Sequence, residues 1–261
     1  RPPSSPLSDD RRQRQMCIRD RDTAMDKTQV KSTREQCHTG IIIAILLLLS
    51  VTVQPVIAGQ TMGNPSSIKL PEPHTDAGTS VEQALRLRRS VRTFAEKPLR
   101  LSEVAQLLWS AQGITSRDGL RTAPSAGALY PLEIYLVAGS VNDLPVGVWH
   151  YLPDNHRLEQ LNDTDIRKPL THAALDQVWI RKAAAVVVFA AVYERTTRKY
   201  GKRGIRYVHI EAGHAAENLF LQAVSLDLNT VIVGAFRDDA IRNALKLPQD
   251  HAPLILMPVG R

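Results

Sequence analysis

Cysteine is nearly absent from this sequence. The 261 residues include two cysteines, Cys17 and Cys37, and both lie within the first 58 residues. We expect the chain to be cleaved after Ala58, at the end of a signal peptide, so the remaining protein would contain no thiol. That would exclude disulfide bonds and cysteine metal ligands.

Excess charge of one sign is also small beyond residue 58. Residues 1–58 hold nine Lys and Arg and six Asp and Glu, which leaves 24 basic and 20 acidic residues in the rest of the chain. The resulting net charge of about +4 is mild, so local basic clusters are more informative than the overall charge. We expect no nucleic-acid partner. The composition, with 43% hydrophobic residues and no internal repeat, predicts one folded domain.

The first 58 residues indicate an exported protein. Residues 1–24 are interpreted as a non-native leader, because RRQRQMCIRDR resembles translated adaptor sequence, and Met25 is the expected start. Residues 25–58 have the basic residues, the apolar run Ile41–Val53 and the small-residue site before Gly59 that are typical of a signal peptide. The alternative is an uncleaved membrane anchor, since flanking residues could extend the run toward the roughly 20 residues of a spanning helix. Either way, we expect a periplasmic or other extracytoplasmic location.

Residues 59–79 are rich in Pro, Gly, Ser and Thr and are expected to form an extended linker, whereas residues 80–261 form the folded domain. Apolar spacing predicts helices, with Ser80 and Ser102 as N-caps and Gly113 ending the second helix. The predicted helices cover residues 80–88, Leu101–Gln112, Arg206–Leu226 and Asp238–Leu245.

Five apolar runs predict strands. They are Leu132–Ala138, Gly147–Tyr151, Ala183–Val192, Asn229–Phe236 and Leu254–Gly260. The Ala183 run is apolar on both faces, so we expect a central strand covered by helices on each side. Helices and strands without strict βαβ alternation favour an α+β fold, with a mixed sheet flanked by helices in a three-layer α/β/α sandwich.

A cluster of cations stands at the C-terminal end of the first predicted helix. In RRSVRTF, the residues Arg88, Arg89 and Arg92 surround Ser90. The helix dipole is negative there, so side chains would have to hold any anion. Guanidinium groups bind phosphate through paired hydrogen bonds, and a serine hydroxyl adds a donor. The alternative is that the cations simply decorate a helix C-terminus, which is favourable on its own.

A turn of small residues follows in RTAPSAGALYPLEIYLV. Pro124 and Pro131 favour a rigid turn between them. A flat ligand could lie close to the backbone beside the small residues Ser125, Ala126, Gly127 and Ala128.

Five motifs occur in order and together indicate a family: RRSVRTF, LLWSAQGI, RTAPSAGALYPLEIYLV, RKYGKRGIRYVHIEAGHAAENLFLQA and VGAF. From about Ser80 to Arg261 the chain resembles the FMN-dependent nitroreductase superfamily, specifically its SagB-type dehydrogenase branch. This branch includes the thiazoline and oxazoline dehydrogenases of azole-peptide biosynthesis. The resemblance implies a nitroreductase-like fold, FMN as cofactor, a homodimer with two shared flavin sites, and a small-molecule or peptide substrate.

The resemblance also implies roles for individual residues. The segment that would bind the FMN phosphate and ribityl chain contains Arg88, Arg89, Ser90 and Arg92. The loop that reaches FMN across the dimer interface matches Ser125, Ala126, Gly127 and Ala128. Backbone near the isoalloxazine ring matches Gly234 and Ala235.

The basic segment RTTRKYGKRG contains the candidate catalytic side chains. Lys199 and Tyr200 match a pair proposed as acid and base in the azole-forming members. Dehydrogenation sends a hydride to the flavin and a proton to a base, and such a pair would supply the base. The alternative is a solvated basic loop that contacts an anionic surface.

A metal site is not expected, although His209, Glu211 and His214 resemble a ligand set by residue type. At about 100° per residue, His209 lies about 200° from Glu211 and about 140° from His214 around the helix, so the three do not converge. Glu211 and His214 are expected to be structural hydrogen-bonding residues.

Two features depart from the family. The given sequence stops directly after MPVG and Arg261, so a basic tail that helps to hold phosphate in other nitroreductases is either absent or lost through truncation. Reduced nicotinamide is not expected outside the cytoplasm, and without a twin-arginine pair after Met25 the FMN would be loaded after export. The leading hypothesis is therefore an exported FMN-dependent oxidoreductase that passes electrons to oxygen or a quinone. The alternative is a non-catalytic flavin or anionic-ligand binding protein of the same fold.

Overall fold

The computed structural model describes residues 66–261, so the predicted leader (1–24) and the signal peptide or anchor (25–58) lie outside the described residues. One seven-stranded sheet runs through this part, in the order β1-β4-β3-β2-β5-β7-β6. Its strands are β1 (Ser67–Lys69), β2 (Leu132–Ala138), β3 (Gly147–Leu152), β4 (Arg157–Asn162), β5 (Ala185–Ala191), β6 (Asn229–Thr230) and β7 (Ala252–Gly260).

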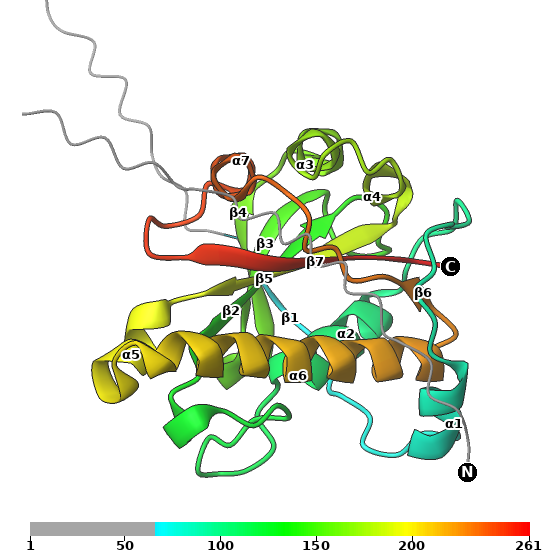
Figure 1. Ribbon diagram of the computed structural model, residues 1–261. Helices are drawn as coiled ribbons and strands as arrows, with labels where there is room; N and C mark the ends of the chain where they lie inside the picture. Colours follow the sequence, from blue (N-terminus) through cyan, green and yellow to red (C-terminus); the bar gives the residue numbers. More distant parts are fainter. Residues whose placement is uncertain (1–65) are drawn as a thin grey trace, which may run out of the picture. The chain divides into compact units, whose positions relative to one another are not determined.

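Helices cover both faces of this sheet (Figure 1). They are α1 (Val81–Leu87), α2 (Leu101–Gln112), α3 (Arg167–Ala173), α4 (Trp179–Lys182), α5 (Tyr193–Tyr200), α6 (Arg203–Ser225) and α7 (Asp238–Leu245), with short 3-10 turns η1 (Ala126–Ala128) and η2 (Pro153–Asn155). Helices α2 and α6 lie on one face, and α3, α4 and α7 lie on the other. Within residues 66–261, no helix combines the length and apolar character needed to cross a membrane.

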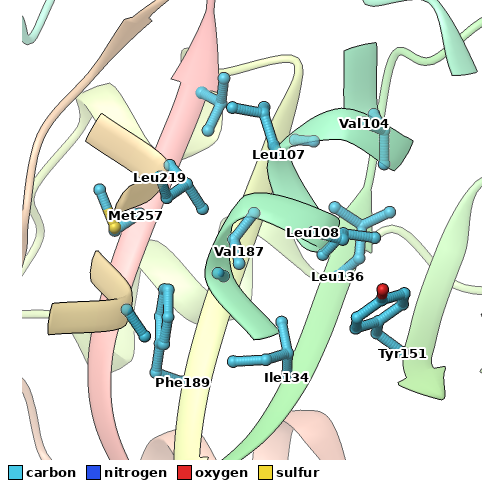
Figure 2. Packing of buried hydrophobic residues seen from close by; sticks show 14 of the residues in the cluster. Val104, Leu107, Leu108, Ile134, Leu136, Tyr151, Val187, Phe189, Leu219 and Met257 are labelled. Atoms are coloured by element: carbon cyan, nitrogen blue, oxygen red, sulfur yellow. The ribbon is translucent and has the colours of Figure 1, made fainter. Parts of the chain in front are cut away.

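Strand β5 separates two hydrophobic cores, which confirms the predicted central strand. All seven of its residues are buried. Val187 and Phe189 point into the core formed with α2 and α6, as Figure 2 shows, whereas Val186 and Val188 point into the core formed with α3, α4 and α7. Because successive side chains of a strand alternate between faces, a strand covered on both sides must be apolar throughout. The predicted three-layer α+β sandwich is therefore confirmed.

The sheet differs from the prediction in one respect. We expected a mixed sheet, but all six strand pairs of the described chain are antiparallel. Connectivity accounts for two of these pairs: β2, β3 and β4 follow one another as hairpins, and hairpin partners are necessarily antiparallel.

Helix α2 covers its predicted range, but its predicted N-cap is wrong. Arg100 is the N-cap, and Ser102 lies inside the first turn. The Glu103 carboxylate accepts a hydrogen bond of 2.8 Å from the backbone N–H of Arg100. The acidic residue at the third helical position therefore pairs the N–H of the N-cap residue itself, as the glutamate of a capping box does.

The predicted strand Asn229–Phe236 is mostly absent. Only β6 forms a ladder, followed by an isolated bridge between Val233 and Leu256. The register places Val231 opposite Pro258, which has no N–H to donate. The predicted linker also differs, because its residues 67–69 form β1 and Leu70 is buried.

Candidate functional site

The predicted phosphate-binding segment lies beside the edge strand β6. The backbone N–H of Val91 donates to the carbonyl of Thr230 over 2.9 Å, which holds the segment against the end of the sheet. Arg88 follows α1, where its guanidinium lies 5.1 Å from the Phe220 ring centre on α6. Arg92 extends toward the other layer and lies 5.7 Å from the Trp179 ring of α4.

The four polar residues of this segment are not equivalent. Arg89 donates to the carbonyls of Arg86 and Arg88 over 3.0 and 2.6 Å, so it caps the C-terminal end of α1. For Arg89, this contact agrees with the alternative interpretation, in which cations stabilise the C-terminal end of a helix without binding a ligand. Arg88 is about one-third exposed with a long contact of 3.8 Å to Glu217, and Ser90 and Arg92 are exposed. Arg88 and Arg92 therefore remain available to an anion.

The small-residue turn is strained. Gly127 has φ +67°, Ala128 +53° and Tyr130 +44°, so three residues out of four occupy the left-handed region. Such backbone conformations are costly for residues other than glycine and concentrate at functional sites. The turn is held by a hydrogen bond of 2.9 Å from the Tyr130 N–H to Ser125 Oγ and by Arg195, whose Nη1 donates to the Tyr130 carbonyl over 3.0 Å.

This turn meets the predicted catalytic pair. A methyl group at Gly127 would lie 2.7 Å from the Tyr200 hydroxyl and 3.0 Å from Lys199 Nζ, so a larger residue here would displace these side chains. Lys199 Nζ lies 5.4 Å from the Tyr200 ring centre, and Tyr200 packs edge-on against Tyr207. Two motifs that are 72 positions apart in the sequence therefore form one surface.

The cationic segment and this surface lie at opposite ends of α6 (Figure 1). Helix α5, which ends with Lys199 and Tyr200, precedes the N-terminal end of α6, whereas α1 and Arg88 pack near its C-terminal half. A helix of 23 residues is about 34 Å long. Gly234 and Ala235 follow β6 in an exposed loop, and a side chain at Gly234 would meet no atom within 4 Å.

A buried carboxyl group lies beneath the turn. Glu211 of α6 is 2% exposed, and burial raises its pKa to about 7, an effect that Ser125, Arg121 and Gln112 only partly offset. Arg121 Nη1 donates to Gln112 Oε1 over 2.9 Å. The central carbon of its guanidinium group lies 4.5 Å from the centre of the Tyr130 ring. The sequence predicted a structural role for Glu211 but not its burial, because that burial depends on how α6 packs on the turn.

A second, partly buried polar network was not predicted. His150 Nε2 lies 2.7 Å from Glu133 Oε2, and Arg195 pairs with the other carboxylate oxygen. Burial alone would raise the pKa of Glu133, but the His150 hydrogen bond and the Arg195 charge outweigh it and lower the pKa to about 2. The Tyr135 ring stacks on the His150 ring, and the Tyr135 hydroxyl lies 2.6 Å from His251 Nδ1. Because Arg195 belongs to α5, this network fixes the helix that carries Lys199 and Tyr200.

The three residues considered for metal binding face different surroundings. His209 Nε2 lies 2.6 Å from the Tyr193 hydroxyl, Glu211 faces the turn, and His214 is exposed. Within the part of the chain that the structure describes, no three His, Cys, Asp or Glu side chains gather as metal ligands.

Residues 85–261 match the model of the Nitroreductase family, and the chain belongs to this family. It is 46% identical over 200 residues to MJ1384 of Methanocaldococcus jannaschii, a protein named provisionally as a nitroreductase, with 77% of this chain and 98% of that protein covered. The microcin B17-processing protein McbC of Escherichia coli is 30% identical over 148 residues, which cover 54% of each chain. A crystal structure described as a nitroreductase from Ralstonia eutropha superposes with a TM-score of 0.68 at 29% identity, covering 76% of this chain and 90% of that one.

Proposed function

We propose that this chain is an FMN-dependent oxidoreductase of the SagB dehydrogenase type, which moves a hydride between flavin and a small-molecule or peptide substrate. The observation that supports it most is the contact of Gly127 with Lys199 and Tyr200, because a strained turn is held against two groups that can transfer protons. The similarity to McbC, whose name describes microcin processing, supports a peptide substrate.

The residues present fit FMN. Arg88 and Arg92 are available cations that suit a phosphate, with Ser90 between them as a hydroxyl donor. Gly234 leaves space beside its backbone for a flat ring. When bound, the flavin supplies the acceptor or donor of the hydride.

The protein's own part of the reaction is to orient the substrate and move a proton. Oxidation of a C–N or C–C bond releases a proton as the hydride departs, and Lys199 in its unprotonated amine form, beside the Tyr200 hydroxyl at the Gly127 backbone, would accept that proton. The pair Glu133 and Arg195 keeps α5 in place during this step.

We propose further that the complete site is shared by two copies of the chain. Within one chain, the cations and the catalytic pair are separated along α6, so a single ligand of FMN size cannot contact both. Ile205 and Ile210 on α6 are 45% and 49% exposed, which suits a face covered by a partner.

Export remains part of this proposal, and it rests on the sequence of residues 25–58. The mature protein would be periplasmic or extracytoplasmic, either free or tethered by an uncleaved anchor. Outside the cytoplasm the electron partner would be oxygen or a quinone rather than reduced nicotinamide.

The visible absorption spectrum of the protein tests flavin binding after incubation with FMN and removal of excess ligand. The wild type should show bound oxidised flavin, and Arg88→Ala/Arg92→Ala should lose it, whereas Arg86→Ala in the preceding helix α1 should retain it. A colourless, folded wild type would contradict the proposal.

Lys199→Met/Tyr200→Phe should keep the flavin but lose turnover with oxidisable substrates. Bound flavin that no donor or acceptor changes would instead favour a non-catalytic binding protein.

A further inference from the structure

The excess positive charge beyond residue 58 is concentrated in one segment, residues 195–210. That part of the chain holds 24 basic and 20 acidic residues, and the segment contains six of the basic ones and none of the acidic ones. Without the segment, 18 basic and 20 acidic residues would remain. The net positive charge is therefore a local feature of the protein and calls for a local explanation.

Most of these six cations have no acidic partner within the described chain. Arg195 pairs with Glu133, and Arg198 pairs with Glu194. The other four are exposed and form no ion pair with any carboxylate of residues 66–261. They are Lys199, Lys202, Arg203 and Arg206. Their charges are available to an anion from outside the chain.

The start of α6 is an unfavourable place for cations. The positive end of the helix dipole lies there, and acidic residues or a side-chain cap normally stabilise it. Helix α6 has neither, because its first turn contains no acidic residue and no side-chain hydrogen bond caps it. Arg203 and Arg206 stand there instead. Placements that cost stability in this way are typical of functional surfaces.

The cations belong to a rigid corner next to the proposed catalytic pair. Gly204, in the first turn of α6, packs directly on α5, where an added methyl group would lie 2.9 Å from the Thr197 Cα. Lys199 lies in the last turn of α5 and approaches Gly127, and Lys202 stands at the start of α6. The close packing of the two helices therefore fixes the unpaired cations relative to the turn that contains Gly127.

An open hollow of about 870 Å³ lies along the N-terminal part of α6. Its walls combine cations with apolar side chains, namely Lys202, Arg203, Ile205, Arg206, His209 and Ile210. This space holds much more than one small anion, since a water molecule in the liquid occupies about 30 Å³. Lys202 and Arg206 are separated by about 6 Å along the helix axis. Several carboxylates along an extended peptide would match this row, and the isoleucines would contact apolar side chains between them.

We propose that residues 199–210 bind an acidic peptide segment that flanks the reacting residue of the substrate. The inference rests on the proposed function, because that function places the reaction beside Lys199 and Tyr200. It deepens that function by naming the substrate class, a peptide with carboxylates near the bond that reacts. A second copy over Ile205 and Ile210 is compatible with it, since long Lys and Arg side chains can reach the polar rim of an interface.

Fluorescence polarisation with two labelled peptides tests binding to the flavin-free full chain. One peptide alternates glutamate and leucine, and the other has glutamine in place of each glutamate. The wild type should bind the acidic peptide at least about tenfold more tightly, and added salt should weaken this binding. Lys202→Glu/Arg206→Glu should lose at least about tenfold in affinity for it. Lys168→Glu/Arg181→Glu changes the net charge equally on α3 and α4, and should lose less than about twofold.

Urea unfolding of the same variants separates binding from folding. Glutamate is favoured at the start of a helix, so Lys202→Glu/Arg206→Glu should unfold at the same or a higher urea concentration than the wild type. Lost peptide binding in a variant of unchanged or greater stability supports the proposed surface. If that variant does not fold, Lys202→Gln/Arg206→Gln replaces it, and unchanged binding there overturns the proposal.

Equal binding of the two peptides, or equal losses in the two charge-reversal variants, would also overturn it. So would binding of phosphatidylglycerol vesicles through Lys202 and Arg206 by a chain that binds neither peptide, since the occupant would then be a membrane surface. Turnover of an uncharged substrate by the flavin-loaded protein is measured separately. Turnover without a preference for acidic peptides would retain the proposed function and refute this inference, whereas selective binding without turnover would retain the inference alone.

Discussion

At the scale of single residues, two carboxyl groups, one buried and one partly buried, have opposite effects on stability. The pKa of Glu211 is raised from its usual 4.5 to about 7, so the folded state binds this proton more tightly than the unfolded state. Its contribution is present below pH 4.5 and is lost as pH rises through 7, a loss of about 3 kcal/mol at one pKa unit per 1.36 kcal/mol.

Glu211→Gln should therefore remove this loss. Urea unfolding from pH 4 to 9 should show a stability that falls less with pH than in the wild type, with the variant more stable above pH 8. Glu217→Gln serves as the control on the same helix. A variant that falls as steeply as the wild type would show that Glu211 is not the titrating group.

Glu133 behaves in the opposite way. His150 and Arg195 lower its pKa to about 2, so its contribution is present above pH 4.5 and is lost as pH falls toward 2. Glu133→Gln should cost about 3 kcal/mol or less at pH 7 and flatten the acid side of the stability curve. Acid unfolding measured by circular dichroism checks this, and an unchanged acid limb would contradict it.

At the scale of elements, the turn at 125–128 depends on glycine. Gly127→Ala would combine φ +67° with a methyl group 2.7 Å from the Tyr200 hydroxyl. We expect a loss of about 1–3 kcal/mol in unfolding free energy and a displaced Tyr200. Gly119→Ala is the matched control, because Gly119 has φ +77° but no atom within 4 Å of the added methyl group. Equal losses in the two variants would show that the Tyr200 contact contributes nothing.

The sequence predicted those elements whose pattern matches their burial. Helices Leu101–Gln112 and Asp238–Leu245 have the predicted bounds because their apolar residues follow the helical period. Strand Leu132–Ala138 does so because it is a mostly apolar run that contributes to both cores. Strand β4 has one buried residue, and α5, YERTTRKY, consists of charged residues, threonines and two tyrosines, so neither has an apolar period to detect. Their positions are set by neighbouring strands and by α6, which is tertiary information.

The site was predictable only in part for the same reason. Motifs located Lys199, Tyr200 and Gly127 separately, but their contact depends on how α5 packs beside the turn. The capping role of Arg89 and the pairing of Glu133 with Arg195 depend on side-chain positions that no spacing rule gives.

At the scale of the whole molecule, the proposed shared site requires a dimer. Replacing Ile205 and Ile210 by Lys should place charges on the α6 face and yield a folded monomer that binds less FMN, measured by light scattering and absorbance. Leu175→Lys is the control, since Leu175 is 57% exposed and lies between α3 and α4 on the other layer. A double variant that remains dimeric would assign the interface to another face.

The most direct test of the central claim is a subunit-mixing measurement. One chain carries Arg88→Ala/Arg92→Ala and the other carries Gly127→Glu, and heterodimers are isolated by two different affinity tags. Each homodimer should be colourless. If cations and turn come from different subunits, the heterodimer contains one intact site and should bind about half of the wild-type flavin. A heterodimer as colourless as its parents, beside a wild type that binds FMN, would contradict the shared site.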